Sequence, residues 1–196
     1  MKCLLVVTHP LDDSLCKTLC KHVEKRLTQA GHEVVVEDLY SDSFDPVLSS
    51  KERKSYYSGS YDSSEIEAQT ERLRNAQVLI LLFPTWWFGF PAMLKGWFDR
   101  VWGPGIAYEH ADDYGPIRSK LDNLERVLAI TSMGSPWWID RLVMWQPVKR
   151  VLKLALMGAC AKGAKLQFLT LYNSENLNEQ QASAFKERID RALNIW

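Results

Sequence analysis

Five short apolar runs alternate along the chain with segments whose apolar residues recur at helical spacing. The runs are rich in Val, Ile and Leu, which is typical of strands that are covered on both faces of a sheet. They are residues 2–8, 33–39, 76–83, 126–131 and 165–171. Strands that alternate with helices in this way form a parallel sheet between two helical layers. The pattern therefore predicts a single α/β domain that spans residues 1–196.

The segments between these runs carry apolar residues three and four positions apart, which indicates amphipathic helices. A starting residue marks each helix, either a polar cap or a proline in the first turn. The first helix has its apolar stripe from Leu15 to Leu27, after a candidate cap at Asp13 or Ser14. The other expected starts, in chain order, are Ser64 in a capping box with Glu67, Pro91, Pro147 and Asn178. The apolar stripe expected after Pro147 is Val148, Val151, Leu152, Ala155 and Leu156. Residues 41–63, rich in Ser, Asp and Tyr, predict a long surface excursion rather than a domain boundary.

Composition places the chain among ordinary globular proteins. Of its 196 residues, 46% are apolar and 24% are charged, which excludes a disordered or collagen-like chain. Lys and Arg together number 24, as do Asp and Glu, so the formal net charge is zero. Proteins that neutralise nucleic-acid phosphates carry a basic excess, and we therefore expect no nucleic-acid partner.

The cysteines and the apolar segments bear on the compartment. Cys3, Cys16, Cys20 and Cys160 fit no zinc-binding spacing, and a chain of this length needs no disulfides. The first residues lack the apolar length and the cleavage site of a signal peptide. Residues 78–98, the most apolar stretch, contain two prolines and a lysine, which argues against a transmembrane helix. We expect a cytoplasmic protein without a metal site or a membrane span.

Ligands of open parallel sheets bind at the carboxyl ends of the strands, where the strand order reverses. The loops after the first, third and fourth strands are therefore the candidate sites. The first loop, residues 8–14, has no glycine and so lacks the fingerprint of NAD-binding Rossmann domains. Its His9 and Ser14 precede a helix whose free N–H groups suit a phosphate. The alternative is that Asp13 or Ser14 only caps the helix and that His9 is a satisfied turn residue.

The other two loops offer flat side chains and backbone donors. Trp86, Trp87 and Phe88 follow the third strand, and they either form a wall of a ring-binding site or fill the core. After the fourth strand, Gly134 precedes two further tryptophans. This glycine either presents backbone N–H groups to a ligand or is a plain turn beside an apolar patch.

A long motif follows the third strand. Residues 83–102 read FPTWWFGFPAMLKGWFDRVW and resemble the signature FP-x-x-WFG-x-PA-x-LKGWF-x-RV of the flavodoxin-like NAD(P)H:quinone oxidoreductases, the family of DT-diaphorase and its bacterial relatives. Residues 105–108 (GIAY) and 115–120 (GPIRSK) resemble the same family. The resemblance implies a flavodoxin-like three-layer sandwich with strand order 2-1-3-4-5. It also implies a non-covalent FMN or FAD and ping-pong hydride transfer from NAD(P)H to quinones or similar electrophiles.

The resemblance further implies a homodimer with composite active sites. Members of the family bury the helix that begins at Pro91 against a second subunit. In this chain that helix carries Trp97, Phe98 and Trp102, which are more large apolar residues than one buried stripe requires. Surplus apolar surface of this kind is typical of an interface.

The resemblance also implies roles for individual residues. Tyr108 would cover the open face of the flavin. Reduction leaves negative charge on the ring, and on physical grounds we expect the backbone N–H groups of Met133 and Gly134 to stabilise it. The tyrosine and histidine that other members place after the third loop are missing, because residues 136–141 read PWWIDR and leave Arg141 as the nearest downstream cation. The phosphate end is assigned to His9, Ser14, Leu15 and Cys16, the ring to Pro84, Thr85, Trp86, Trp87 and Phe88, and the pyrimidine side to Thr131, Ser132, Met133 and Gly134.

Two other functions are open at this point. Some proteins that resemble this chain serve as regulatory subunits of potassium efflux systems, in which the redox activity is ancillary. A one-electron carrier of the flavodoxin type is the second alternative. Flavodoxins tend to be strongly acidic, whereas this chain carries no net charge, which argues against a carrier.

Overall fold

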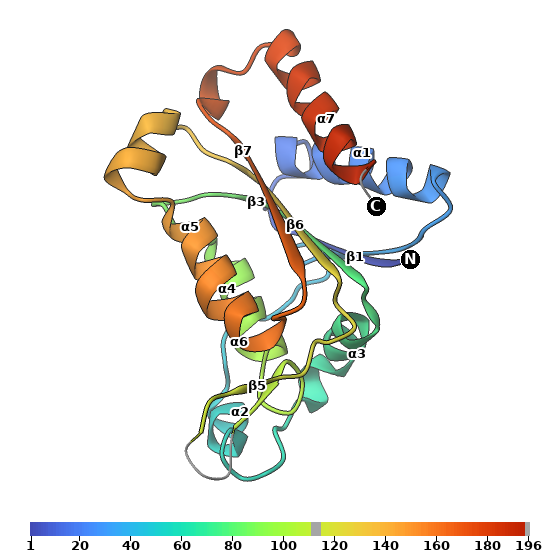
Figure 1. The fold of residues 1–196 in the computed structure, drawn as a ribbon, viewed down its shortest axis with the longest axis vertical. Helices are drawn as coiled ribbons and strands as arrows, with labels where there is room; N and C mark the ends of the chain where they lie inside the picture. Colours follow the sequence, from blue (N-terminus) through green and yellow to red (C-terminus); the bar gives the residue numbers. More distant parts are fainter. Residues whose placement is uncertain (111–114, 195–196) are drawn as a thin grey trace.

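The computed structural model describes residues 1–110 and 115–194. Its centre is a parallel sheet of five strands in the order β2-β1-β3-β6-β7, which is the expected order 2-1-3-4-5 when only the strands of this sheet are counted (Figure 1). Every expected strand lies within two residues of the observed bounds. The strands are β1 (Lys2–Val7), β2 (Glu33–Asp38), β3 (Val78–Pro84), β6 (Arg126–Ser132) and β7 (Lys165–Leu171).

Helices cover both faces of the sheet, so the expected three-layer sandwich is confirmed. Because strand side chains alternate between faces, Leu4 and Val6 of β1 pack with one helical layer, and Leu5 and Val7 pack with the other. One layer holds α1 (Leu15–Gln29) and α7 (Glu179–Leu193). The other holds α3 (Glu67–Asn75), α4 (Ala92–Val101) and a helical run made of α5 (Pro147–Arg150), η3 (Val151–Met157) and α6 (Gly158–Cys160).

The caps of the first and last helices follow the sequence. Ser14 caps α1, where its Oγ accepts a hydrogen bond from the N–H of Lys17. Gly31 follows the end of α1 with a φ of 80°, a left-handed conformation that glycine adopts without strain. Asn178 caps α7 in a reciprocal capping box with Gln181.

The capping box expected at Ser64 and Glu67 is wrong. The N–H and the hydroxyl of Ser64 both donate to Oδ1 of Asp62, and residues 64–66 form a short 3-10 turn, η1 (Ser64–Ile66). The side chain of Asp62 therefore holds the serine that was expected to cap the helix. The helix α3 begins after this turn, at Glu67.

The stripe expected after Pro147 is also partly wrong. Val148 and Leu152 are buried as expected, but Val151 and Ala155 face solvent, and Met157 takes the next buried position. The reason is that η3 is a π-helix, in which hydrogen bonds join residues five apart rather than four. Leu152 and Met157 are five residues apart and lie on the same face.

The apolar surplus expected on α4 is buried within one chain. Trp97, Phe98 and Trp102 lie in the core, and the rings of Phe98 and Trp102 pack edge to face with centroids 5.3 Å apart. The argument that these residues form an exposed interface is therefore wrong. Exposed apolar surface gathers instead on residues 137–154, where three tryptophans face solvent.

The excursion over residues 41–63 is held against α4. It contains the short helix α2 (Ser50–Ser55), and its Phe44 is buried in the core below. Glu52 of α2 pairs with Arg100 of α4, and the hydroxyl of Tyr56 donates to the carbonyl of Asp99 at 2.7 Å. The segment is thus a strap across α4 rather than a free loop.

A two-stranded hairpin that the apolar pattern did not predict completes the fold. Its strands are β4 (Tyr108–Glu109) and β5 (Arg118–Ser119), and the hairpin lies at the lower end of the molecule in Figure 1. Within the described residues, no helix combines the length and the apolar character that crossing a membrane requires.

Candidate functional site

Loops after four of the parallel strands meet in one pocket with a volume of about 500 Å³. His9 follows β1, Trp86 and Trp87 follow β3, and the other lining loops follow β6 and β7. The strand order reverses between β1 and β3, which is where ligands of open parallel sheets bind. The lining residues are His9, Pro84, Thr85, Trp86, Trp87, Ser132, Met133, Gly134, Ser174 and Glu175.

The loop after β3 contains a strained turn over residues 86–89, called the tryptophan turn below, that exposes two indoles. The N–H of Gly89 donates to the carbonyl of Trp86, and Trp87 and Phe88 have φ values of 51° and 54°. A turn with two positive φ values usually contains Asn or Gly, and bulky residues there cost conformational energy. Trp86 is 43% and Trp87 is 99% exposed, so neither indole fills the core. Strain of this kind is typical of functional loops.

A buried pair of hydroxyls joins two of the loops below the pocket. Oγ1 of Thr85 and Oγ1 of Thr131 lie 2.7 Å apart, and the N–H of Thr85 donates to the carbonyl of Ser132. Thr85 lines the pocket, whereas Thr131 is buried beneath it. The pair sets the position of the tryptophan turn relative to the loop after β6.

His9, in the first loop, brings a ring nitrogen to the pocket that can donate a hydrogen bond. Its Nδ1 accepts a hydrogen bond from the N–H of Leu11 at 3.1 Å. A neutral imidazole in this arrangement carries its proton on Nε2 and can donate from that atom. The ring centroid lies 6.2 Å from that of Trp86, so the histidine and the indole wall belong to one site.

The other residues assigned to the phosphate end, Ser14, Leu15 and Cys16, form the start of α1. Ser14 is its N-cap, and Leu15 and Cys16 form its first turn, where backbone N–H groups have no partner within the helix. None of these three residues is among those that line the pocket. Burial raises the pKa of the Cys16 thiol to about 12, which excludes a thiolate nucleophile there at neutral pH.

The lysine that follows this loop, Lys17, is already paired. Nζ of Lys17 lies 2.5 Å from Oδ1 of Asp12 and 2.9 Å from Oδ2 of Asp38. The hydrogen bond to Asp12 and the contacts with Asp38 raise the pKa of Lys17. The lysine therefore remains charged, and two carboxylates compete with any ligand phosphate for it.

The expected backbone donors after β6 are only partly available. The N–H of Met133 donates to the carbonyl of Leu171 at 2.9 Å and is therefore occupied. Across residues 1–110 and 115–194, the N–H groups of Trp87, Phe88 and Gly134 have no protein acceptor. These three donors lie on two of the loops that form the pocket.

Two lining residues, Ser174 and Glu175, were not expected from the sequence. They belong to η4 (Ser174–Asn176), which follows β7. A Cβ at Gly134 would lie 2.7 Å from Oε1 of Glu175, so the glycine permits a close approach of these two loops. The sequence did carry a signal, because the carboxyl end of every parallel strand meets the same edge of the sheet.

Tyr108 and Phe88 do not line the pocket. Phe88 is the second central residue of the tryptophan turn and is half-buried. Tyr108 lies in β4, pairs with Ser119, and is half-buried against the core. In Figure 1 its hairpin lies at the end of the molecule away from the loops that follow β6 and β7.

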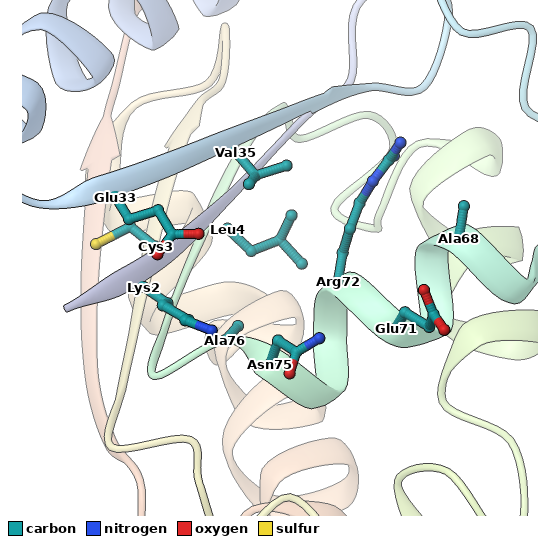
Figure 2. A pocket seen from close by; sticks show the side chains of 10 residues that line it. All are labelled: Lys2, Cys3, Leu4, Glu33, Val35, Ala68, Glu71, Arg72, Asn75 and Ala76. Atoms are coloured by element: carbon teal, nitrogen blue, oxygen red, sulfur yellow. The ribbon is translucent and has the colours of Figure 1, made fainter.

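A second hollow of about 260 Å³ lies at the opposite edge of the sheet. Figure 2 shows Lys2 and Leu4 of β1 and Val35 of β2 facing Arg72 and Asn75 of α3 across it. These residues lie near the amino ends of the strands, whereas ligands of open parallel sheets bind at the carboxyl ends. Arg72 is moreover paired with the buried Glu37 at 3.3 Å. We therefore place the candidate site in the pocket at the carboxyl ends.

Comparison with known proteins agrees with this fold. Residues 1–194 match the flavodoxin-like fold family. NAD(P)H dehydrogenase (quinone) 1 from Cavia porcellus is 34% identical over 152 residues, which cover 68% of this chain and 54% of that protein. An uncharacterized NAD(P)H oxidoreductase from Haemophilus influenzae is 32% identical over 123 residues, which cover 61% of this chain and 60% of that protein. The chain thus spans about half the length of the first of these curated relatives.

Solved structures resemble the whole fold. Smu.1420 from Streptococcus mutans superposes with a TM-score of 0.84 at 28% identity, and 98% of each chain is covered. The NAD(P)H:quinone oxidoreductase from Methanothermobacter marburgensis superposes with a TM-score of 0.82 at 25% identity, covering 98% of this chain and 94% of that one. Because the family match extends over residues 1–194, the protein belongs to the flavodoxin-like fold family.

Proposed function

We propose that this protein is a flavin-dependent NAD(P)H:quinone oxidoreductase. The observation that carries the proposal is the pocket at the carboxyl ends of β1, β3, β6 and β7, whose loops carry both exposed indoles and free backbone donors. Two of the similar proteins named above are described as NAD(P)H-dependent quinone enzymes, which supports the same activity. The proposal extends to residues 1–196 as one flavin-binding domain, of which residues 111–114 and 195–196 lie outside the described structure.

The residues of the pocket suit a flavin. Its volume of about 500 Å³ lies within the range of about 300–1,000 Å³ that is usual for cofactor sites. The indoles of Trp86 and Trp87 offer flat surfaces to a ring system, and the N–H group of Gly134 suits the polar edge of such a ring. The Nε2 donor of His9 and the first turn of α1 suit a phosphate. FMN and FAD share these features, and either is compatible with the proposal.

The protein would supply binding, orientation and electrostatics to the bound flavin. When bound, the flavin supplies the hydride chemistry itself. The free N–H groups of Trp87, Phe88 and Gly134 are oriented before the reaction and would stabilise developing negative charge without a proton relay. Ser14 contributes as the cap that fixes the start of α1, and its hydroxyl hydrogen remains available as a donor.

We also propose a homodimer. Trp137, Trp138, Leu142, Val143 and Trp145 form exposed apolar surface on the segment that follows Gly134. Large apolar residues that are exposed together on one short segment are typical of an interaction site. A second copy of the chain would cover this surface. The Tyr108 of that second copy would then take the position over the flavin that the sequence resemblance assigns to this residue. Sedimentation that shows a monomer at micromolar concentration would contradict this proposal.

The cysteines are compatible with a reducing compartment, and we propose the cytoplasm. Cys3, Cys16, Cys20 and Cys160 are all free and buried. Disulfides are typical of oxidising compartments, whereas free thiols suit the cytosol. None of the similar proteins named above is described as a transporter subunit, so the regulatory alternative has no support from them.

The function is tested by purifying the protein and identifying the cofactor that heat or acid releases from it. We expect yellow protein, about one FMN or FAD per chain, and parallel double-reciprocal plots when NAD(P)H and a quinone such as menadione are varied together. Purified protein that neither contains a flavin nor binds an added one would overturn the proposal.

A further inference from the structure

Glu175 is the one carboxylate among the residues that line the candidate flavin pocket, and neither Lys nor Arg is among them. It lies on the loop after β7, which the sequence motif of the family does not include. Within the described part of the chain, no basic side chain comes within ion-pair distance of Glu175. Lys17, in the first turn of α1, is paired with Asp12 and Asp38. The pocket therefore contains a negative charge that no protein cation neutralises.

Backbone hydrogen bonds fix the loop that carries Glu175. The N–H of Ser174 donates to the carbonyl of Met133 at 3.1 Å, and the N–H of Asn173 donates to that of Ser135 at 3.4 Å. Asn173 has a φ of 54°, a left-handed conformation that turns the chain into η4. The loop after β7 is thus attached to the loop after β6 on both sides of Gly134. Oε1 of Glu175 consequently lies close above the glycine, at 2.7 Å from the place of an added Cβ.

This inference rests on the proposed function, under which Gly134 lies beside the pyrimidine side of the flavin. Hydride transfer from NAD(P)H adds two electrons and one proton to the flavin, so negative charge develops on that side of the ring. A carboxylate nearby opposes the new charge, and a pocket without a compensating cation does not offset it. The reduced flavin should therefore bind less tightly than it would without the charge of Glu175.

We infer that Glu175 is an electrostatic residue that lowers the reduction potential of the bound flavin and so favours delivery of the hydride to the acceptor. The overall reaction is unchanged: NAD(P)H, a quinone and one proton from solvent give NAD(P)⁺ and the hydroquinone. Glu175 neither gains nor loses a bond in it. Its charge shifts the equilibrium between the two half-reactions, which makes reduction by NAD(P)H less favourable and reduction of the quinone more favourable.

Glutamine at position 175 separates the charge from the shape. Glu175→Gln keeps the volume above Gly134 and an oxygen that accepts hydrogen bonds, but it removes the negative charge. The matched control is Glu179→Gln, which removes a carboxylate four residues further on, at the exposed start of α7 and outside the pocket. Any change that the two variants share reflects net charge or folding rather than the site.

The experiment measures the midpoint potential of the bound flavin by anaerobic equilibration with a reference dye, together with the dissociation constant of the oxidised flavin. We expect Glu175→Gln to favour the reduced over the oxidised flavin by about tenfold, which is a rise of about 30 mV for a two-electron couple. Glu179→Gln should match the wild type. Because Glu175 is exposed, raising the salt concentration should reduce the difference.

The outcomes distinguish this inference from the proposed function. A wild type that binds no flavin overturns both. The inference alone is overturned if the wild type binds flavin but Glu175→Gln changes the midpoint potential by less than the equivalent of a twofold change in the equilibrium constant for flavin reduction. An equal shift in Glu179→Gln overturns it as well.

Discussion

Nε of Arg100 donates to Oε1 of Glu52 at 2.8 Å, and each side chain is only 3% exposed. The pair joins α4, in the core, to α2 of the strap that crosses it. Arg100 also donates to the carbonyl of Asp45, so its guanidinium ties the strap at two separate points. A buried charge that loses its partner is costly, whereas an exposed ion pair contributes little.

Removing Arg100 should therefore destabilise the protein strongly. Arg100→Met leaves Glu52 buried without its partner, and we expect the free energy of unfolding to fall by about 3–5 kcal/mol. The control is Glu65→Gln, because Glu65 pairs with the same arginine at 3.1 Å but is mostly exposed. That variant should lose less than about 1 kcal/mol. Urea denaturation measures both, and equal losses would show that the buried pair has no special role.

The Thr85–Thr131 hydroxyl pair predicts a non-additive result. Thr85→Val or Thr131→Val alone leaves one buried hydroxyl without a partner, which should cost about 1–3 kcal/mol. The double variant removes both hydroxyls and should be less destabilised than the sum of the single variants. Thermal unfolding of the four proteins gives the coupling energy. Strict additivity would mean that the 2.7 Å contact contributes no net stability.

A charge at Ser14 tests the proposed phosphate end. Ser14→Asp adds a negative charge at the cap of α1, whereas Ser14→Asn adds none, and both residues cap helices about as well as serine. Repulsion of the flavin phosphate should lower flavin affinity more than about tenfold in the aspartate variant only. Flavin content after dialysis decides the question, with circular dichroism as the check that both variants fold. Equal retention of flavin by the two variants would show that the flavin phosphate does not bind at this loop.

Arg141 should be dispensable for flavin reduction. It is exposed, lies outside the set of residues that line the pocket, and follows the loop whose backbone donors we assign to the flavin. Arg141→Ala should leave the rate of flavin reduction by NAD(P)H, measured by stopped flow, within a few-fold of the wild type. Loss of an essential charge-stabilising group would instead cost about two to three orders of magnitude. A hundredfold decrease would show that the arginine, not the backbone, stabilises the reduced ring.

The sequence predicted those parts of the fold that depend on local patterns. The five strands of the sheet are apolar runs with clear ends, and the caps at Ser14 and Asn178 involve neighbouring residues. The order of the strands depends on contacts between distant segments and came from the resemblance. The hairpin of β4 and β5 escaped prediction because two residues per strand leave no period to detect.

The candidate site was predicted in part for the same reason. His9, Trp86 and Gly134 lie at strand ends that the sequence marks, and they line one pocket. Glu175 was missed because its approach to Gly134 depends on hydrogen bonds between the loops after β6 and β7. The exposure of Val151 was missed because a π-helix has no signature in the spacing of apolar residues.

The tryptophan turn has a consequence for any attempt to engineer this protein. Trp87 and Phe88 hold left-handed backbone conformations in which glycine or asparagine would be more stable. A library selected only for heat resistance would therefore enrich small residues at these two positions and gain melting temperature. The same clones would keep the backbone of the turn but lose the exposed indole of Trp87 from the pocket. Thermostabilised descendants of this chain would thus need selection for cofactor retention at every round.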